Sequence, residues 1–199
     1  MARWLVVGLG NPGPAYARQR HNVGAMVAAE LARRGAARWQ PRRLLQAELA
    51  EIKIGAAGTG AVGADLEQVT LARTRTYMNE SGGPVKQILS QLRLKPDHLI
   101  VIHDELDLDF TRLRAKFGGG DNGHNGLKSI RARLGTGDYY RVRVGIGRPT
   151  GRIDVHDWVL SNFGPDQTDD LPQVVARAAD AVECLTRHGL EAAQQGFNS

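Results

Sequence analysis

The chain has 199 residues, of which 42% are hydrophobic and 24% are charged. This length and balance predict one globular domain over residues 1–199 and exclude a disordered or fibrous chain, and the single cysteine, Cys184, excludes a disulfide framework and a zinc site of several thiolates. The net charge of +5 favours an acidic partner such as nucleic acid, although the same charge also keeps a protein soluble without binding anything.

An apolar run at residues 4–7 predicts the first strand, and Gly8, Gly10 and Gly13 follow it in the spacing G-x-G-x-x-G. That spacing is the fingerprint of dinucleotide binding, which would make the protein a nicotinamide-dependent oxidoreductase. The fingerprint needs a helix that begins within the glycines, whereas the prolines on either side of Gly13 predict a turn. The sequence therefore disfavours a dinucleotide cofactor.

The same apolar run is too short for the hydrophobic part of a signal peptide. No other run approaches the ~18 apolar residues that indicate a membrane-spanning helix. We therefore expect a cytoplasmic protein with no membrane partner.

Two strands are predicted at residues 46–54 and 67–73, joined by a glycine-rich hairpin loop at residues 55–63. Residues 76–84 follow the second strand and precede a helix with a buried stripe of Val85, Ile88, Leu89 and Leu92. Asn79 then lies at a strand-to-helix junction, where it could serve a site or act only as a cap or turn residue.

Residues 99–128 bring several polar groups together. The apolar run at 99–102 predicts a strand covered on both faces, so Asp104 falls near its carboxyl end. Three consecutive glycines at 118–120 allow the backbone to approach another group closely. His124 and Asn125 follow, where a helix beginning near residue 126 exposes its first amides. Because sites in α/β sheets gather at the carboxyl ends of strands, this stretch predicts a functional rim.

Basic residues alternate with apolar ones on two further predicted strands, at residues 112–116 and 139–147. Their cations could form one phosphate-binding surface or an ordinary solvated face; they are Arg112, Arg114, Lys116, Arg141 and Arg143. A partly apolar, lid-like piece is expected at 155–163 and a last helix at about 168–187, with Cys184 buried. Strands interleaved with helices predict a three-layer α/β/α sandwich around a twisted mixed sheet.

General-base activation of water by a histidine is the chemistry that remains. A metal site is disfavoured because His103, Asp104 and Glu105 are contiguous on a strand and alternate between its faces. His21 and His124 lie in turns beside other polar groups, where each could equally be a hydrogen-bonded turn residue. An imidazole, with an ordinary pKa of ~6.5, can accept a proton at pH 7, and Asp104 is the carboxylate best placed to support it.

Five blocks of the sequence resemble bacterial-type peptidyl-tRNA hydrolase and occur in the order of that family. The blocks are Val7-Gly-Leu-Gly-Asn-Pro-Gly13 with Tyr16 and Arg20-His21-Asn22; Thr76-Tyr-Met-Asn79 with Ser81-Gly82; His103-Asp104-Glu-Leu-Asp107; Gly118-Gly-Gly with Gly123-His-Asn125-Gly-Leu-Lys128; and Arg141-Val-Arg-Val-Gly-Ile-Gly147. One departure concerns Asp121 and Asn122, because an acid inside the glycine-rich loop would repel a neighbouring phosphate.

The resemblance implies an enzyme that cleaves the ester between a peptide and the 3′ ribose of tRNA, without a metal or organic cofactor and as a monomer. It implies that His21 activates water, that Asp104 supports it and that Asn11 shares the catalytic site. The matched positions that would hold the peptide or the 3′ end are Tyr16, Met78, Asn79, His124 and Asn125. Those that would bind phosphates of the acceptor stem are Arg114, Lys116 and Arg143. The alternative is a non-catalytic RNA-binding protein of the same fold, against which the presence of His21, Asp104 and Asn11 counts.

Overall fold

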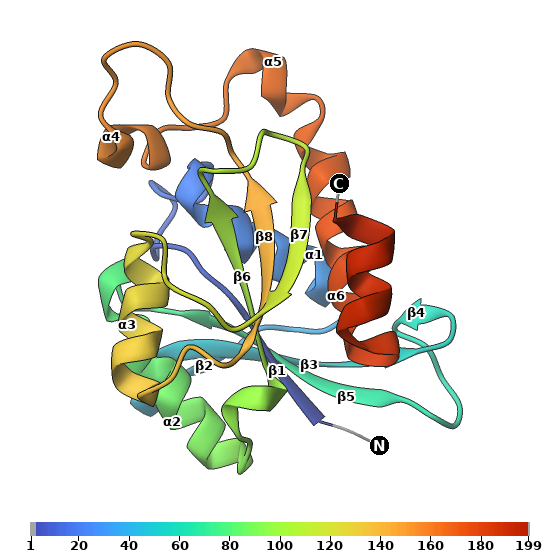
Figure 1. The fold of residues 1–199 in the computed structure, drawn as a ribbon. Coiled ribbons are helices and arrows are strands. Elements are labelled where there is room, and N and C mark those ends of the chain that lie inside the picture. The colour runs from blue at the N-terminus through green and yellow to red at the C-terminus, as the bar shows by residue number, and fades with distance from the viewer. Residues whose placement is uncertain (1–2, 199) are drawn as a thin grey trace.

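A computed structural model describes residues 3–198 and contains one eight-stranded mixed sheet (Figure 1). The strand order is β2-β3-β5-β1-β6-β8-β7, and β4 pairs with β3. Strands β5, β1, β6 and β8 run parallel to one another, while β2, β3 and β7 pair with antiparallel neighbours. The strands are β1 (Arg3–Gly8), β2 (Gln40–Arg42), β3 (Ala47–Gly55), β4 (Gly58–Thr59), β5 (Glu67–Thr74), β6 (Leu99–Glu105), β7 (Leu113–Phe117) and β8 (Tyr140–Gly145).

Helices cover both faces of this sheet (Figure 1). One face packs against α1 (Val23–Arg34) and α6 (Leu171–Phe197), and the other packs against α2 (Gly82–Leu92) and α3 (Asn125–Leu134). The short helices α4 (Val155–Val159) and α5 (Pro165–Thr168) lie beyond the carboxyl ends of β6 and β8. Four 3-10 turns complete the chain: η1 (Arg20–Asn22), η2 (Arg43–Leu45), η3 (Met78–Glu80) and η4 (Pro96–His98). The predicted three-layer sandwich with a mixed sheet is confirmed.

Strand β6 is buried along its whole length, including the polar residues at its carboxyl end. Its apolar part contributes Ile100 and Ile102 to one core and Leu99 and Val101 to the other, as the alternation of a strand covered on both faces requires. Because its neighbours β1 and β8 are parallel to it, their carboxyl ends meet at the same edge. The central strand thus delivers Asp104 to a rim formed by several loops.

The glycines after β1 serve close packing and do not open a helix. Helix α1 begins only at Val23, so the arrangement of a dinucleotide fingerprint is not formed. A Cβ atom on Gly24 would lie 2.2 Å from the carbonyl oxygen of Ile102, and one on Gly8 would lie 2.3 Å from that of Gly24. Since neither position has room for a side chain, α1 and the η1 turn before it lie directly against β1 and β6.

The C-terminal helix agrees with its prediction in extent, but the expectation that Cys184 is buried is wrong. The helix predicted at about 168–187 is the first segment of α6, which begins at Leu171; non-helical backbone angles at Gly189 (φ 82°, ψ −179°) separate this segment from a second one that ends at Phe197. The apolar stripe resumes after this glycine with Ala193, which is fully buried, so packing extends the helical region beyond the predicted end. Cys184 is half-buried, because it lies at the margin of the stripe rather than facing the sheet. Among residues 3–198, no helix has the length and apolar character needed to cross a membrane.

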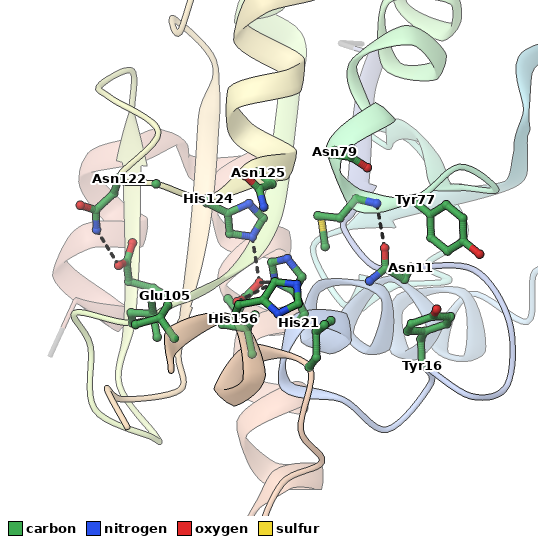
Figure 2. A pocket seen from close by; sticks show the side chains of 17 residues that line it. Asn11, Tyr16, His21, Tyr77, Asn79, Glu105, Asn122, His124, Asn125 and His156 are labelled. Carbon is green, nitrogen blue, oxygen red and sulfur yellow. Dashed lines mark hydrogen bonds and ion pairs between the residues drawn. The ribbon is translucent and has the colours of Figure 1, made fainter. Parts of the chain in front are cut away.

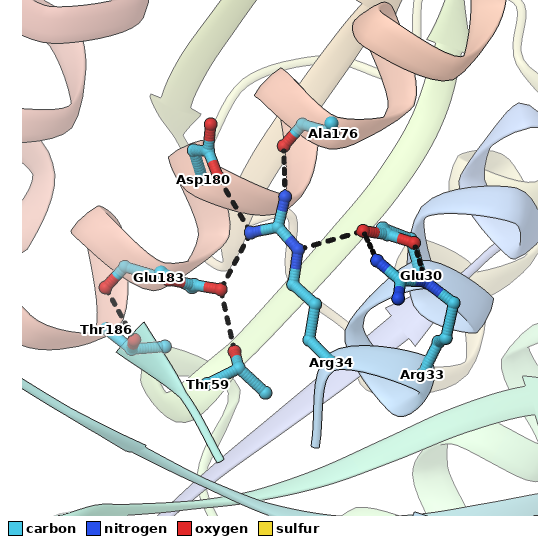
Figure 3. Close-up of polar contacts among 8 residues, drawn as sticks. All are labelled: Glu30, Arg33, Arg34, Thr59, Ala176, Asp180, Glu183 and Thr186. Atoms are coloured by element: carbon cyan, nitrogen blue, oxygen red, sulfur yellow. Dashed lines mark hydrogen bonds and ion pairs between the residues drawn. The ribbon is translucent and has the colours of Figure 1, made fainter. Parts of the chain in front are cut away.

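Arg34, at the end of α1, ties this helix to α6 (Figure 3). Its guanidinium donates hydrogen bonds to Asp180 at 2.7 Å, to Glu183 at 2.9 Å and to Glu30 at 3.0 Å, and also to the Ala176 carbonyl at 3.1 Å. The side chain is only 20% exposed, so these charge-assisted bonds are partly shielded from water. The network therefore fixes the contact between α1 and α6.

We expect Arg34→Gln to lower the free energy of unfolding at pH 7 by about 2 kcal/mol, because it leaves several half-buried carboxylates without their cation. The Arg33 guanidinium, together with Arg34, lowers the pKa of Glu30 from 4.5 to about 2, although burial opposes this. A carboxyl whose pKa is lower in the folded state stabilises the fold above its unfolded pKa. The part of the Arg34→Gln effect that passes through Glu30 should therefore shrink as the pH falls from about 4.5 towards 2, and Arg33→Gln should share this pH dependence because Arg33 is the larger cause of the shift.

Urea unfolding at several pH values measures this difference, and Arg33→Gln is the matched control. Arg33 is 73% exposed and contacts Glu30 alone, so its replacement should cost less than about 1 kcal/mol. Equal effects of the two substitutions would show that Arg34 does not hold the two helices together.

Candidate active site

A cavity of about 620 Å³ opens at the edge where β1, β5 and β6 end (Figure 2). The loops after these strands, the loop between β7 and α3 with the first residue of α3, and helix α4 form its wall. Its lining residues are Asn11, Tyr16, His21, Tyr77, Met78, Asn79, Asp104, Glu105, Leu106, Asn122, Gly123, His124, Asn125, Val155, His156, Val159 and Leu160. All eight residues that the sequence predicted for catalysis or for holding the peptide or the 3′ end are among them.

His21 and Asp104, which come from distant parts of the sequence, are in direct contact. The Nδ1 atom of His21 lies 2.9 Å from both carboxylate oxygens of Asp104, and the two side chains are 9% and 2% exposed. A carboxylate can only accept, so Nδ1 carries a proton that it donates to Asp104. The other ring nitrogen, Nε2, is left as the proton acceptor. This is the arrangement of a general base that is oriented by a carboxylate.

His124 makes a second contact with the same carboxylate, through Nε2 at 2.8 Å from Oδ1 of Asp104. Its Nδ1 atom accepts hydrogen bonds from the backbone N–H groups of Gly126 at 3.1 Å and Leu127 at 3.3 Å, so His124 caps the N-terminus of α3. Since Nδ1 is an acceptor there, the proton lies on Nε2 and is donated to Asp104. The cap thereby fixes both the tautomer of His124 and its direction towards the acid.

Asp104 is an anion shared by two imidazoles. Burial would raise the pKa of Asp104, but the neighbouring His124 and His21 outweigh burial and hold that pKa well below its usual range. The two rings lie 4.8 Å apart, centroid to centroid. Within residues 3–198 these three side chains are also the group whose atoms could hold a metal ion, since their donor atoms lie within 4.8 Å of one another. A metal ion there would have to displace the protons that both imidazoles donate to Asp104.

Asn11 is held in one orientation by its surroundings. Its backbone N–H donates to Oδ1 of Asn22 at 3.0 Å, and its backbone carbonyl accepts from Nδ2 of the same residue at 2.9 Å. Its side-chain oxygen accepts from the backbone N–H of Met78 at 2.7 Å. The remaining polar group, the side-chain NH₂, points towards His21 in Figure 2. Asn11 therefore offers a fixed hydrogen-bond donor to the cavity.

Several residues of the cavity wall were not found from the sequence. Tyr77 packs edge-on against Tyr16, with ring centroids 6.1 Å apart, and His156 reaches the cavity from α4 (Figure 2). The lid-like character expected for residues 155–163 was the one signal available for His156, because an exposed histidine on a short helix has no distinctive pattern. For Tyr77, its place beside Met78 and Asn79 was the corresponding signal.

A second cavity of about 320 Å³ lies on the face of the sheet that α3 covers, beside the first. It is lined by His103, Glu105, Asp107, Lys116, Gly120, Asn122, Leu127, Arg141 and Arg143, so it shares Glu105 and Asn122 with the first cavity. The strand register puts the predicted cations on this face, with Arg114 opposite Arg143 and Lys116 opposite Arg141. Lys116 and Arg143 line the cavity, whereas Arg114 lies exposed on the same strand outside it.

Arg141 differs from the other cations of this face. It is 3% exposed, and its guanidinium donates hydrogen bonds to the carbonyls of Gly119, Gly120 and Gly137. These bonds hold the glycine-rich loop in place. Arg141 therefore does not belong to an open phosphate-binding surface, one of the two alternatives for these cations, because it is buried and its Nη1 and Nη2 atoms are bonded to backbone carbonyls.

The family model for peptidyl-tRNA hydrolase matches residues 5–199 of this chain. The chain belongs to the peptidyl-tRNA hydrolase family. It is 56% identical over 196 residues to the peptidyl-tRNA hydrolase of Cutibacterium acnes, and the match covers 98% of each protein. It is 50% identical over 198 residues to that of Streptomyces avermitilis, covering 100% of this chain and 95% of the relative.

The solved structures agree with this family assignment. A crystal structure of peptidyl-tRNA hydrolase from Acinetobacter baumannii superimposes with a TM-score of 0.86 at 29% sequence identity. The superposition covers 98% of this chain and 94% of that one. The resemblance seen in the sequence is therefore confirmed over the whole fold of this family member.

Proposed function

We propose that this member of the peptidyl-tRNA hydrolase family cleaves the ester between a peptide and the 3′ ribose of tRNA, with a water molecule that His21 activates. The observation that carries this assignment is the 2.9 Å contact between His21 and Asp104 inside a cavity lined by amide side chains. An ester requires only a good water nucleophile and hydrogen-bond donors for the oxyanion, so these groups suffice for the reaction.

The proposed chemistry proceeds in two proton transfers. Nε2 of His21 takes a proton from water as the resulting hydroxide attacks the ester carbonyl, and the Asp104 carboxylate stabilises the imidazolium that forms. The tetrahedral intermediate then collapses with release of the 3′ oxygen, which receives the proton back from His21. The side-chain NH₂ of Asn11 is placed to donate to the oxyanion, because its oxygen is already committed to the Met78 N–H.

The remaining wall of the first cavity suits a peptide and the terminal nucleotide. Asn79 and Asn125 present exposed amides, which can pair with peptide carbonyl and N–H groups without a change of charge. Tyr16 and Tyr77 add an aromatic flank on which a ring can stack. Met78 is 4% exposed and supports this wall from below.

The second cavity and the strand beside it suit the acceptor stem of the tRNA. Lys116 and Arg143 line that cavity and Arg114 extends the basic face, so phosphates could be bound there while the 3′ end enters the first cavity. We further propose that the protein works as a single domain and a monomer, in the cytoplasm and without a cofactor. The proposed chemistry uses only side chains of this chain and water, so it calls for neither a cofactor nor a second subunit.

The test is hydrolysis of N-acetyl-aminoacyl-tRNA by the purified protein, followed as release of deacylated tRNA with a chelator in the buffer. We expect multiple turnovers per enzyme molecule. Binding of deacylated tRNA without any ester cleavage would instead support the non-catalytic RNA-binding alternative, which the family match and the His21–Asp104 contact disfavour.

A further inference from the structure

We infer that, in the free protein, the carboxylate of Glu105 binds Arg143 in the position that a phosphate of the substrate would take. Because the two anions compete for the same guanidinium, Glu105 limits how tightly the tRNA is held. This inference rests on the proposed function, since it takes the second cavity to be a phosphate site. The ligand class is a phosphate group of RNA, either a terminal monoester or a backbone diester. Glu105 would then be a residue that determines affinity and specificity, distinct from the residues of the ester chemistry.

Glu105 divides its two oxygens between two neighbours. Oε2 accepts hydrogen bonds from Nε of Arg143 at 3.0 Å and forms an ion pair with Nη2 at 2.9 Å, so the guanidinium is engaged along one edge. Oε1 accepts from Nδ2 of Asn122 at 3.0 Å and from the backbone N–H of Asp107 at 3.1 Å. The Glu105 side chain is 5% exposed, and that of Arg143 is 20% exposed.

Because only Oε2 of Glu105 contacts Arg143, the guanidinium can turn to another partner without leaving the buried Glu105 carboxylate with no hydrogen-bond donor. When Arg143 turns to a phosphate, the Glu105 carboxylate still accepts two hydrogen bonds through Oε1, from the loop and from the backbone. A buried carboxylate that lost every donor would be far more costly. In Glu105 the Nε and Nη2 atoms of Arg143 share the single oxygen Oε2, whereas a phosphate offers one oxygen to each of them, so the guanidinium gains a two-oxygen partner in the exchange.

The other charges in the cavity favour such an exchange. Lys116 lies on the same wall, and within residues 3–198 no carboxylate lies at ion-pair distance from its ammonium group. Arg141 is committed to the loop carbonyls, and Asp107 is paired with Arg148 at 2.7 Å. Burial, and next the proximity of His124, lower the pKa of His103 to about 3, so this wall residue is neutral. A phosphate would therefore meet Lys116 and Arg143, with Glu105 as the anion that it must displace.

Asn122, in the glycine-rich loop, also holds Glu105 in place. Its side-chain nitrogen donates to Glu105 at 3.0 Å and to Asp107 at 2.7 Å, and its backbone adopts a left-handed conformation with φ of 50°. Asp121, whose charge the sequence analysis expected to repel phosphate, approaches Arg131 at 4.0 Å and does not line the second cavity. The acid that opposes the phosphate is therefore Glu105, which the sequence analysis did not single out.

The decisive variant is Glu105→Gln, assayed as equilibrium binding of deacylated tRNA over a range of salt concentrations. Glutamine keeps an oxygen for Asn122 and the Asp107 N–H, but it presents an NH₂ donor to Arg143 and so frees that cation. We expect binding about fivefold tighter at low salt, the size of a modest coupling between two sites. The slope of log affinity against log salt should steepen by roughly one phosphate contact. Inhibition of binding by inorganic phosphate should strengthen as well.

Two controls make the result specific. Asp107→Asn removes a carboxylate from the same cavity wall that pairs with Arg148 and not with Arg143, so its effect should be clearly smaller. In an Arg143→Gln background, Glu105→Gln should no longer tighten binding, because the cation it frees is missing. Treating the tRNA with phosphatase separates the two sources: loss of the effect identifies a terminal monoester, and its persistence identifies a backbone diester.

The outcome that overturns the inference is unchanged or weaker tRNA binding by a Glu105→Gln protein with normal thermal unfolding, since Glu105 would then merely orient Arg143. A Glu105→Gln protein that unfolds more readily and also binds tRNA less tightly would overturn it in the same way.

The phosphate site itself is tested separately by Lys116→Ala, which should weaken binding and flatten the salt slope by roughly one contact. If neither Lys116→Ala nor Arg143→Gln weakens binding, the proposed phosphate site is wrong; if both do and Glu105→Gln does not tighten it, only the stand-in role is wrong.

Discussion

His21→Ala should lower the turnover number for N-acetyl-aminoacyl-tRNA on the order of 10²-fold or more, with little change in the Michaelis constant. The imidazole is the group proposed to take the proton from water, and its Nδ1–H already donates a hydrogen bond to Asp104 at 2.9 Å. Alanine removes the acceptor while leaving the amides and the basic face that bind the substrate. Single-turnover measurement of tRNA release at saturating enzyme isolates this chemical step.

His188→Ala is the matched control, because His188 is exposed on α6 and lies outside both cavities. Its turnover should equal that of the parent protein. A thermal unfolding measurement on both variants separates loss of chemistry from loss of fold. Unchanged turnover in a folded His21→Ala protein would remove His21 from the role of base.

The architecture could be predicted from local patterns because each central element carries its own signal. The apolar run at 99–102 has no polar interruption, so it predicts a strand covered on both faces, and β6 is that strand. The alternation of Arg141, Val142 and Arg143 likewise fixed which residues share a face of β8. The end of the long segment of α6 just before Gly189 was predicted, but the short helical segment after Gly189 was not, because its formation depends on tertiary packing of residues such as Ala193.

The residues of the candidate site were predicted from the sequence, but the hydrogen bonds between them were not. The blocks that resemble the family identified His21, Asp104 and His124, but no local pattern says that one carboxylate accepts from both rings. The two hydrogen bonds between Asn22 and Asn11, and the ion pair of Glu105 with Arg143, were missed for the same reason. Each joins residues whose distance is set by how α1, β6 and β8 pack, so the information lies in the tertiary fold.

These unpredicted contacts explain how the buried carboxylate of Asp104 can orient the imidazole of His21 for accepting a proton. Asp104 receives N–H donors from His21 and His124, and these neighbours lower its pKa although burial opposes this, so Asp104 is an anion at pH 7. His124 is in turn fixed by capping α3. The helix N-terminus, the second imidazole and the carboxylate therefore form one chain of contacts that determines which nitrogen of His21 is free.

Asp104→Asn follows from this chain of contacts and should lower turnover about 10⁴-fold, the scale seen when the acid behind a catalytic histidine becomes an amide. The NH₂ group of asparagine would take the place of Oδ2, 2.9 Å from Nδ1 of His21, while the remaining Oδ1 would be shared between His21 and His124. A His21 tautomer with its proton on Nε2 accepts from the new NH₂ donor and relieves this competition, but Nε2 is the nitrogen that must accept from water. The remaining oxygen can still accept from Nε2 of His124, so the pocket should keep its shape and the Michaelis constant its size.

Single-turnover rates, tRNA binding and thermal unfolding of Asp104→Asn test this expectation together, with Asp97→Asn as the control. Asp97 precedes β6 at the opposite end of that strand, and its ion-pair partner among the described residues is the partly exposed His98, so the same chemical change there should leave turnover unaltered. Normal tRNA binding with the large rate loss is the expected pattern, because the defect lies in the tautomer of His21 and not in recognition. A rate close to that of the parent would show that the carboxylate is dispensable, and that His21 reaches its reactive form without Asp104.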